Sequence, residues 1–268
     1  MARPRLDQIL VERGLAPSRT RAQALIMAGR VRSDGIRLEK PGTRIAPDTP
    51  LTVDPGEHYV SRGGLKLEGA LAMFHGGVAG LTALDVGAST GGFTQVLLEA
   101  GAVRVIALDV GRGQLDWSLR TDSRVTVIEG FNARHMNPAD LPHQPDVAVI
   151  DVSFISLTLI LPAVFRCLPA GGQVVALVKP QFEAGRGKVG KGGIVRDRAV
   201  HREVLERIVA FATENHWGIR SIAVSSIRGA EGNVEFFIGL TADPAGLDPT
   251  ELDTMIGLLT SDQEGASG

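Results

Sequence analysis

The sequence predicts an α/β protein in which a mostly parallel sheet with helices on both faces follows a small α+β domain. Three observations support this prediction. Apolar runs alternate with amphipathic segments from residue 81 onward, as expected for strands joined by helical crossovers. A glycine-rich turn interrupts this alternation at 84–94, between an apolar run and an amphipathic segment. Residues 3–54 instead show two short helical patterns followed by strand-like pieces.

The first segment, residues 3–54, is predicted to form two helices and several short strands. Apolar residues recur at helical spacing from Leu6 to Leu10, and Gly14 ends that pattern. Ser18 suits the N-cap of a second helix, which Gly29 ends. The rest of the segment reads as short strands broken by Asp-Gly, Pro-Gly and Pro-Asp turns.

Glycines, arginines and apolar residues of this segment share a recognisable spacing: Arg5-Leu-Asp-Gln-Ile-Leu, Gly14-Leu, Ser18-Arg-Thr-Arg-Ala and Ala28-Gly-Arg-Val. Over about fifty residues the segment resembles the S4 RNA-binding domain. The resemblance implies binding to structured RNA, and guanidinium groups suit bidentate contact with phosphate. We therefore expect RNA contacts from Arg3, Arg5, Arg19, Arg21 and Arg30. The alternative is an S4-like fold that contacts protein.

Charge is unevenly distributed along the chain. Residues 1–47 contain ten of the 28 lysines and arginines but only four of the 30 acidic residues, so a basic head precedes an acidic body. This asymmetry indicates a polyanionic partner that the head contacts, although a solvated charged surface would give the same count. Cys167 is the single cysteine, which excludes a disulfide framework and fits a reducing compartment.

The body of the chain alternates between strands and helices. A short segment, 55–62, contains Pro and Gly and is predicted to link the S4-like domain to a second domain at 63–242, with a tail at 243–268. A helix is expected from Ser61 to about Phe74 and a short one within the tail. The last two strands are too close in sequence for a helical crossover, so they should pair antiparallel. Strands are predicted at 81–86, 103–109, 124–128, 146–151, 173–178, 219–225 and 233–240, and helices at 91–100, 156–167, 198–215 and 249–259.

The glycine turn at 84–94 predicts a nucleotide-like cofactor at the carboxyl end of a strand. Its spacing is not that of the dinucleotide fingerprint, because Ser89 stands where the second glycine would be. An acid before the turn and another at the end of the next strand resemble instead the pattern that binds S-adenosylmethionine. In that pattern Asp109 accepts the ribose hydroxyls and Asn132 reads the adenine edge. The cofactor set is therefore Asp85, Gly87, Ala88, Ser89, Gly91, Gly92, Phe93, Asp109 and Asn132, although Phe93 would serve equally well as a core residue.

A second glycine cluster, 185–192, nearly fits the phosphate-binding P-loop. It lacks the Ser or Thr that would bind Mg²⁺, and no helix is predicted directly after it. We expect instead a basic loop that contacts RNA phosphate through Arg186, Lys188 and Lys191, and we add Arg62 to the RNA contacts.

Three kinds of methyl acceptor can be distinguished. Base N-methylation is disfavoured, because the fourth strand ends in Asp151-Val-Ser-Phe and not in the Asp/Asn-Pro-Pro motif of that class. Carbon methylation needs a cysteine near the cofactor, and Cys167 lies on a helix well after the fourth strand. Methylation of a ribose hydroxyl needs a base, which a lysine can provide if its proton affinity is lowered.

Four charged residues are placed for that reaction: Lys66, Asp151, Lys179 and Glu235. Asp151 and Lys179 end two parallel strands, and Glu235 stands near the start of an antiparallel one, so all three should meet at one edge of the sheet. We expect Lys179 to be the general base, Lys66 and Asp151 to position the hydroxyl and the lysine, and Glu235 to hold one of the lysines. Each residue taken alone could equally be a surface or paired charge. No metal is required.

This Lys-Asp-Lys-Glu set resembles the tetrad of the FtsJ/RrmJ-type ribose 2′-O-methyltransferases. Together with the S4-like head, the motifs Ser61-Arg-Gly-Gly-Leu-Lys, Val178-Lys-Pro-Gln-Phe-Glu and Gly232-Asn-Val-Glu-Phe-Phe resemble the TlyA family, whose members are often labelled haemolysin A. The resemblance implies a Rossmann-like class I methyltransferase sheet. It also implies S-adenosylmethionine as cofactor and 2′-O-methylation of cytidine in RNA of one or both ribosomal subunits.

Three alternatives belong to other classes: a membrane-lytic protein, a non-catalytic S4 RNA-binding protein and a small-molecule methyltransferase. No apolar run approaches the roughly 20 residues of a membrane span. An intact set of four charges disfavours a non-catalytic binder, and the arginine-rich head disfavours a small-molecule substrate. We expect a cytoplasmic, monomeric enzyme whose partners are ribosomal RNA and ribosomal subunits.

Overall fold

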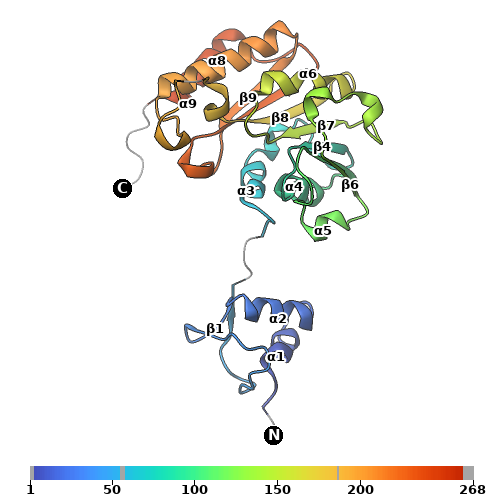
Figure 1. Ribbon diagram of the computed structural model, residues 1–268, viewed down its shortest axis with the longest axis vertical. Coiled ribbons are helices and arrows are strands. Elements are labelled where there is room, and N and C mark those ends of the chain that lie inside the picture. The colour runs from blue at the N-terminus through green and yellow to red at the C-terminus, as the bar shows by residue number, and fades with distance from the viewer. Residues whose placement is uncertain (1–2, 55–57, 186, 262–268) are drawn as a thin grey trace. The chain divides into compact units, whose positions relative to one another are not determined.

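The computed structural model describes residues 3–54, 58–185 and 187–261. The chain separates into two compact units, Met1–His58 and Tyr59–Gly268 (Figure 1). We call them the S4 unit and the methyltransferase unit, after the families that their sequences resemble. Their boundary lies within the segment 55–62, of which residues 55–57 are outside the described part.

The S4 unit contains two helices packed on a small antiparallel sheet. The sheet order is β2-β1-β3, with β1 paired antiparallel to both neighbours. Ser18 accepts a hydrogen bond from the Arg21 backbone amide at 3.2 Å, so the predicted N-cap is confirmed. The elements are α1 (Leu6–Glu12), α2 (Arg19–Met27), β1 (Val31–Ser33), β2 (Ile36–Arg37) and β3 (Thr52–Val53). Their core is Leu6, Ile9, Leu10, Ala16, Ala22, Leu25, Ile26, Val31 and Ile45.

The methyltransferase unit is built on a seven-stranded sheet in the order β6-β5-β4-β7-β8-β10-β9. The first five strands of that order run parallel, whereas β10 is antiparallel to both β8 and β9. The predicted mostly parallel sheet with an antiparallel last strand is therefore confirmed. The strands are β4 (Thr82–Val86), β5 (Arg104–Asp109), β6 (Val125–Glu129), β7 (Val147–Ile150), β8 (Gln173–Val178), β9 (Gly218–Val224) and β10 (Phe236–Thr241).

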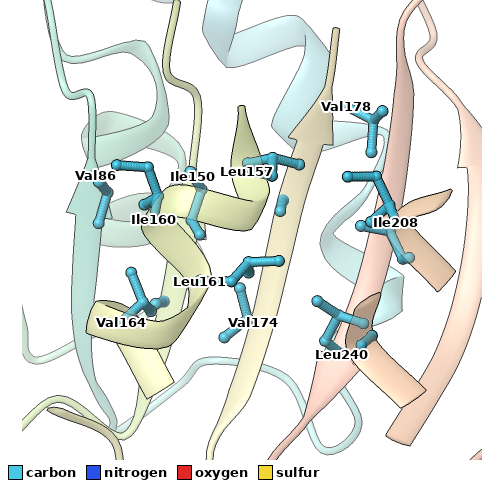
Figure 2. Packing of buried hydrophobic residues seen from close by; sticks show 14 of the residues in the cluster. Val86, Ile150, Leu157, Ile160, Leu161, Val164, Val174, Val178, Ile208 and Leu240 are labelled. Carbon is cyan, nitrogen blue, oxygen red and sulfur yellow. The ribbon is translucent and has the colours of Figure 1, made fainter. Parts of the chain in front are cut away.

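Helices cover both faces of this sheet (Figure 1). On one face Ile160, Leu161 and Val164 of α6 pack over the strands, and Ile208 of α8 packs near Val178 (Figure 2). The opposite face is covered by apolar residues of α3, α4 and α5. The helices are α3 (Arg62–Glu68), α4 (Gly92–Glu99), α5 (Trp117–Arg120), α6 (Leu157–Cys167), α7 (Pro180–Glu183), α8 (Arg198–Glu214) and α9 (Pro249–Thr260). Short 3₁₀ turns are η1 (Leu71–Met73), η2 (Ala133–His135), η3 (Pro138–Asp140), η4 (Lys191–Gly193) and η5 (Ala230–Gly232).

Two of the predicted elements have a bound that differs by three or more residues from the structure. The helix expected from Ser61 to Phe74 ends at Glu68, with Gly69 as its C-cap. Glycine favours such an end, and a Cβ at Gly69 would stand only 3.1 Å from the Ser226 side chain. The last strand begins at Phe236 and not at 233, because the Asn233 side chain is held by backbone groups of a neighbouring loop.

Candidate active site

The glycine turn connects the carboxyl end of β4 to the start of α4. Gly87 has φ +88°, and a Cβ there would lie 2.5 Å from the backbone oxygen of Asp151 at the end of β7. Gly91 has φ +99° and occupies the N-cap of α4. Only glycine adopts these conformations without strain, so the turn passes close to β7 and leaves its backbone open to a ligand.

Two cavities meet at this turn and share Gly87, Ser89 and Asp151. The first cavity, of about 390 Å³, is lined by the first turn of α3, the glycine turn, the start of α4, Asp151 and the loop at 228–229. The second cavity, of about 440 Å³, is lined by the turn, the end of β5, Asn132 and residues 151–155. Together they form an elongated site along the carboxyl ends of the parallel strands, where open α/β sheets bind their ligands.

Polar groups of the second cavity suit a nucleoside. Asp109 accepts hydrogen bonds from the Ser89 amide at 2.8 Å and the Gly111 amide at 2.6 Å, which fix its carboxylate at the end of β5. Each carboxylate oxygen retains a further lone pair for a ribose hydroxyl. The Asn132 side-chain oxygen accepts from the Arg134 amide at 3.1 Å, and its side-chain nitrogen has no partner in the described part of the chain. The residues present therefore fit a nucleoside with a ribose diol and a hydrogen-bonding base.

Most of the residues predicted to hold the cofactor line one or both cavities: Gly87, Ala88, Ser89, Gly92, Phe93, Asp109 and Asn132. Asp85 is placed differently. It is fully buried beneath the turn, and its Oδ2 accepts a hydrogen bond from the Thr94 hydroxyl of α4 at 2.6 Å. Burial raises the pKa of Asp85 to about 7, and the nearby Asp151 charge adds to this, against the hydrogen bond from Thr94. In this position Asp85 holds the start of α4 from below and does not face the cavities.

The first lysine of the predicted set lies on α3. The Nζ atom of Lys66 donates to Oε2 of Glu235 at 2.5 Å, and both side chains are buried. Glu235 directly precedes β10, whose antiparallel direction brings its start to the carboxyl end of β8. The inverted strand therefore carries a carboxylate to the same edge as the glycine turn.

The second lysine lies at the end of β8. The Nζ atom of Lys179 is 2.5 Å from Oδ1 of Asp151 and directs a hydrogen bond to the Ser153 hydroxyl at 3.0 Å. Lys66 and Asp151 line the first cavity, and each contacts a partner, Glu235 or Lys179, that is not part of the cavity wall. The structure thus brings the four predicted residues into two ion pairs at one edge of the sheet.

Sequence reasoning missed several residues of this site. Ser153 and Phe154 directly follow Asp151 in the loop after β7, and Arg228 lies on the wall of the first cavity. Phe154 is 89% exposed with φ +64°, and its ring lies 4.7 Å from that of Phe182. The only sequence signal for Ser153 and Phe154 was their place after a strand that ends in Asp151. Arg228 gave no signal, because it stands in a loop with no motif around it.

The residues predicted to contact RNA are distributed over both units. In the S4 unit the Nε atoms of Arg5 and Arg19 donate hydrogen bonds to the buried carboxylate of Asp7. The distances are 3.0 Å from Arg5 Nε to Oδ1 and 3.0 Å from Arg19 Nε to Oδ2. In the methyltransferase unit Lys188 forms an ion pair with Glu203. The exposed residues of this set are Arg3, Arg19, Arg21, Arg62, Lys188 and Lys191. Arg30 is half-buried, and Arg186 lies outside the described residues.

Within the described residues, no group of three or more His, Cys, Asp or Glu side chains could hold a metal ion. In the same part of the chain, every helix is too short or too polar to cross a membrane. Cys167 is buried in the core between α6 and the sheet, and burial raises its thiol pKa, so it resembles a packing residue and not a nucleophile.

The fold and site define a class of protein. The parallel sheet with an inverted last strand, the glycine turn and the acid at the end of β5 are the features of an S-adenosylmethionine-dependent methyltransferase. The chain belongs to the FtsJ-like methyltransferase family, whose model matches residues 59–242, and it carries an S4 domain matched at residues 4–49. Its cofactor is S-adenosylmethionine.

Relatives match most of the length of the chain. It is 48% identical over 240 residues to the 16S/23S rRNA (cytidine-2′-O)-methyltransferase TlyA of Mycobacterium tuberculosis, covering 89% of this chain and 90% of that protein. It is 42% identical to Hemolysin A of Brachyspira hyodysenteriae, covering 87% of this chain and 97% of the relative. A solved structure from Streptococcus thermophilus, provisionally described as a hemolysin, matches with a TM-score of 0.72 at 45% identity, over 97% of this chain and 96% of that one.

Proposed function

We propose that this enzyme methylates the 2′-hydroxyl of a cytidine in ribosomal RNA of the small subunit, the large subunit or both. One observation carries the proposal: two lysine–carboxylate pairs, the buried Lys66–Glu235 and the partly buried Lys179–Asp151, lie at the edge of the sheet beside the glycine turn. The name of the Mycobacterium tuberculosis relative, which specifies cytidine-2′-O transfer to 16S and 23S rRNA, supports the choice of atom and substrate. The proposal includes a cytoplasmic location, which a ribosomal substrate supports.

The acceptor determines what the protein must supply. A ribose hydroxyl is a weak acid, so its proton must be removed as its oxygen attacks. S-adenosylmethionine supplies a methyl group on a positively charged sulfur, which is activated without metal or protein chemistry. The chain therefore has to align the hydroxyl with that methyl group and accept one proton.

Lys179 is the proposed general base. The ion pair with Asp151 holds Lys179 as an ammonium, so in this proposal the lysine first gives a proton to solvent. The resulting amine then takes the hydroxyl proton as the 2′-oxygen bonds to the methyl carbon and the carbon–sulfur bond breaks, and the cofactor would leave as an uncharged thioether. The carboxylate of Asp151 at 2.5 Å and the hydroxyl of Ser153 at 3.0 Å hold the Nζ atom in place and stabilise the ammonium that forms. Solvent then takes the proton from the lysine.

Lys66 is the proposed positioning cation. It lines the first cavity, where its Nζ atom is free to donate to the ribose, and Glu235 fixes its direction with a bond of 2.5 Å. Asp151 lines the same cavity and faces the ribose from the other pair. The two pairs would thus hold the hydroxyl from two sides.

The remaining predicted residues receive supporting roles. Asp109 would accept the ribose hydroxyls of the cofactor and Asn132 would read its adenine, because both line the second cavity. The glycine turn would pass along the methionine portion, with Phe93 and Asp85 supporting the turn and α4. RNA would be held by Arg3, Arg5, Arg19, Arg21 and Arg30 of the S4 unit and by Arg62, Arg186, Lys188 and Lys191 of the methyltransferase unit.

The decisive experiment is single-turnover methylation with Lys179→Ala. Labelled S-adenosylmethionine and unmodified ribosomal subunits are mixed with excess enzyme, and the label is mapped to a nucleotide and an atom. Loss of a general base should slow transfer by about 10²- to 10⁴-fold. Arg220→Ala, which removes an exposed basic residue of β9 that lines neither cavity, serves as the control. The assignment of Lys179 fails if transfer stays near normal while cofactor binding is intact, and the proposed function fails if the label is on a base or on no RNA at all.

A further inference from the structure

The first cavity carries two arginines for which the proposed reaction has no chemical role. Arg62 stands in the first turn of α3, and Arg228 stands in the loop that precedes Glu235. Both side chains are exposed and both line the cavity that also contains Lys66 and Asp151. The sequence singled out Arg62 as a general RNA contact but offered nothing on Arg228.

These two arginines leave the cavity with uncompensated positive charge. Lys66 and Asp151, the other charged residues of the cavity wall, each lie 2.5 Å from an oppositely charged partner. Within the described part of the chain, no carboxylate pairs with Arg62 or Arg228. Two positive charges at the mouth of a cavity raise the local concentration of anions and favour an anionic ligand.

Both guanidinium groups are anchored through one N–H and keep others free. Arg62 donates from Nη2 to the Arg228 backbone oxygen at 2.8 Å, and Arg228 donates from Nη1 to the Gly232 oxygen at 3.1 Å. Ser226 ties the same loop to α3 through a bond to the Leu65 oxygen at 2.9 Å. A guanidinium has five N–H donors, so most remain available while the group is held in place. The arrangement resembles a prepared anion site more than a pair of free surface charges.

We propose that Arg62 and Arg228 bind a phosphodiester next to the ribose that is methylated. The inference rests on the proposed function, since it assumes that a ribose enters this cavity. Buried residues such as Lys66 form the floor of the cavity, whereas both arginines lie at its exposed rim. In a nucleotide the 3′-phosphate is attached to the carbon beside the one that carries the 2′-hydroxyl. A ribose whose hydroxyl reaches Lys66 therefore places a phosphate at most a few bonds away, toward the rim.

The carboxylate of the cofactor's methionine is the rival anion. It would approach from the shared residues Gly87 and Ser89, along the glycine turn, and would lie inside the cavity. The exposed rim suits a polymer better, because the neighbouring nucleotides can continue into solvent. Guanidinium groups also match phosphate oxygens in bidentate geometry, which fits a phosphodiester at this position.

The test uses the full chain and the double variant Arg62→Gln/Arg228→Gln. Binding of purified ribosomal subunits is measured at several salt concentrations, and binding of S-adenosylhomocysteine is measured by calorimetry without RNA. We expect the affinity for subunits to fall about tenfold or more. The slope of log affinity against log salt should become shallower by about 1 to 2, because one or two phosphate contacts are lost. Affinity for S-adenosylhomocysteine should stay within twofold.

Two further variants make the result specific. Arg62→Lys/Arg228→Lys keeps both charges and should restore most of the salt slope. Arg220→Gln removes an exposed arginine of β9, beside Asp243, and should leave both readouts unchanged. Loss of S-adenosylhomocysteine affinity with an unchanged salt slope would assign the arginines to the methionine carboxylate and overturn the proposal, as would a double variant that binds subunits normally. If the unaltered protein binds subunits but transfers no methyl group, the proposed function fails, and the binding measurements still decide the phosphate contact.

Discussion

Asp7 of the S4 unit and Asp85 of the methyltransferase unit are both fully buried, yet their surroundings are opposite. Asp7 accepts hydrogen bonds at both carboxylate oxygens. Arg5 donates two, at 3.0 and 3.1 Å, and Arg19 and Gln23 donate one each, at 3.0 and 2.8 Å. These bonds, from Arg5 above all, hold the pKa of Asp7 far below its usual range despite the burial.

Within the described residues, Asp85 has a single side-chain donor. The Thr94 hydroxyl bonds to Oδ2 at 2.6 Å, and Oδ1 is buried without a hydrogen-bond partner in the described structure. Burial therefore dominates and raises the pKa of Asp85 to about 7. Burial alone therefore does not decide the charge of a carboxyl group, because the number and charge of its hydrogen-bond donors can reverse the effect.

The largest expected effect follows from Asp7→Asn. The substitution leaves two arginines that face one another without a shared carboxylate, and bonds to charged groups are each worth about 1.5–3 kcal/mol. We expect the S4 unit to lose roughly 3 kcal/mol of unfolding free energy at neutral pH. Hydrogen exchange of the α1 and α2 amides measures this loss without interference from the other unit.

Asp48→Asn is the matched control, since Asp48 is an exposed aspartate of the same unit. It should leave exchange unchanged. The folded state lowers the pKa of Asp7, so this residue stabilises the S4 unit at a pH above its unfolded pKa, which is near 3.9. That stabilisation is lost progressively as the pH falls below 3.9. Equal exchange in both variants would show that the donors contribute no stability.

An effect of similar size is expected from the pH dependence that Asp85 gives the methyltransferase unit. A folded pKa of about 7 means that the folded state holds a proton that the unfolded state releases near pH 4. Stability should therefore decrease as the pH rises from about 4 to about 7, by roughly 2–4 kcal/mol. Urea unfolding followed by the fluorescence of Trp117 and Trp217 measures it.

Asp85→Asn removes this titration and provides the comparison. Asparagine is uncharged at every pH, so the variant should not lose stability through this group as the pH rises. The unfolding free energy of the variant relative to that of the parent should therefore increase between pH 5 and pH 8. Parallel pH profiles for the two proteins would mean that Asp85 keeps an ordinary pKa in the folded state. The argument from its unpartnered oxygen would then be wrong.

Much of the fold was predictable because its signals are local. The apolar run that predicts β8 at 173–178 coincides with the strand, and the Pro249 start predicts α9. The short spacing of the last two strands gave their antiparallel pairing. The position of β10 between β8 and β9 could not be predicted from the sequence, because strand order depends on contacts between residues far apart in the chain. The end of α3 likewise lies against Ser226, which is distant in the chain and donates a hydrogen bond to the Leu65 oxygen.

The site divides in the same way. Strand ends placed Asp151 and Lys179 together, because parallel strands share one edge. The pairing of Lys66 with Glu235 joins residues 169 positions apart, and sequence reasoning left open which lysine the glutamate holds. Asp85 was expected at the cofactor because an acid precedes the glycine turn. Its direction into the core depends on which face of β4 is covered by α4, which only the packed structure gives.

A smaller effect should follow from Thr94→Val, which removes the one side-chain donor of Asp85 while keeping its shape. The lost bond stabilises the charged carboxylate more than the protonated acid, so the pKa of Asp85 should rise further. We expect a loss of about 1–2 kcal/mol at pH 8 and less at pH 5. Urea unfolding at both pH values checks this. A loss that is the same at both would show that the hydroxyl does not distinguish the two forms.

The smallest effect is expected from Gln23→Met, which removes one donor of Asp7 and keeps a similar volume. Arg5 and Arg19 remain to compensate the carboxylate, and the lost bond comes from a neutral amide. Hydrogen exchange of α1 should therefore report a loss of about 0.5–1 kcal/mol, below that of Thr94→Val at pH 8. If Gln23→Met costs as much as Asp7→Asn, the donors of Asp7 act as one cooperative unit. The contrast between Asp7 and Asp85 would then come from a cooperative hydrogen-bond network around Asp7 and not from the number of donors to each carboxylate.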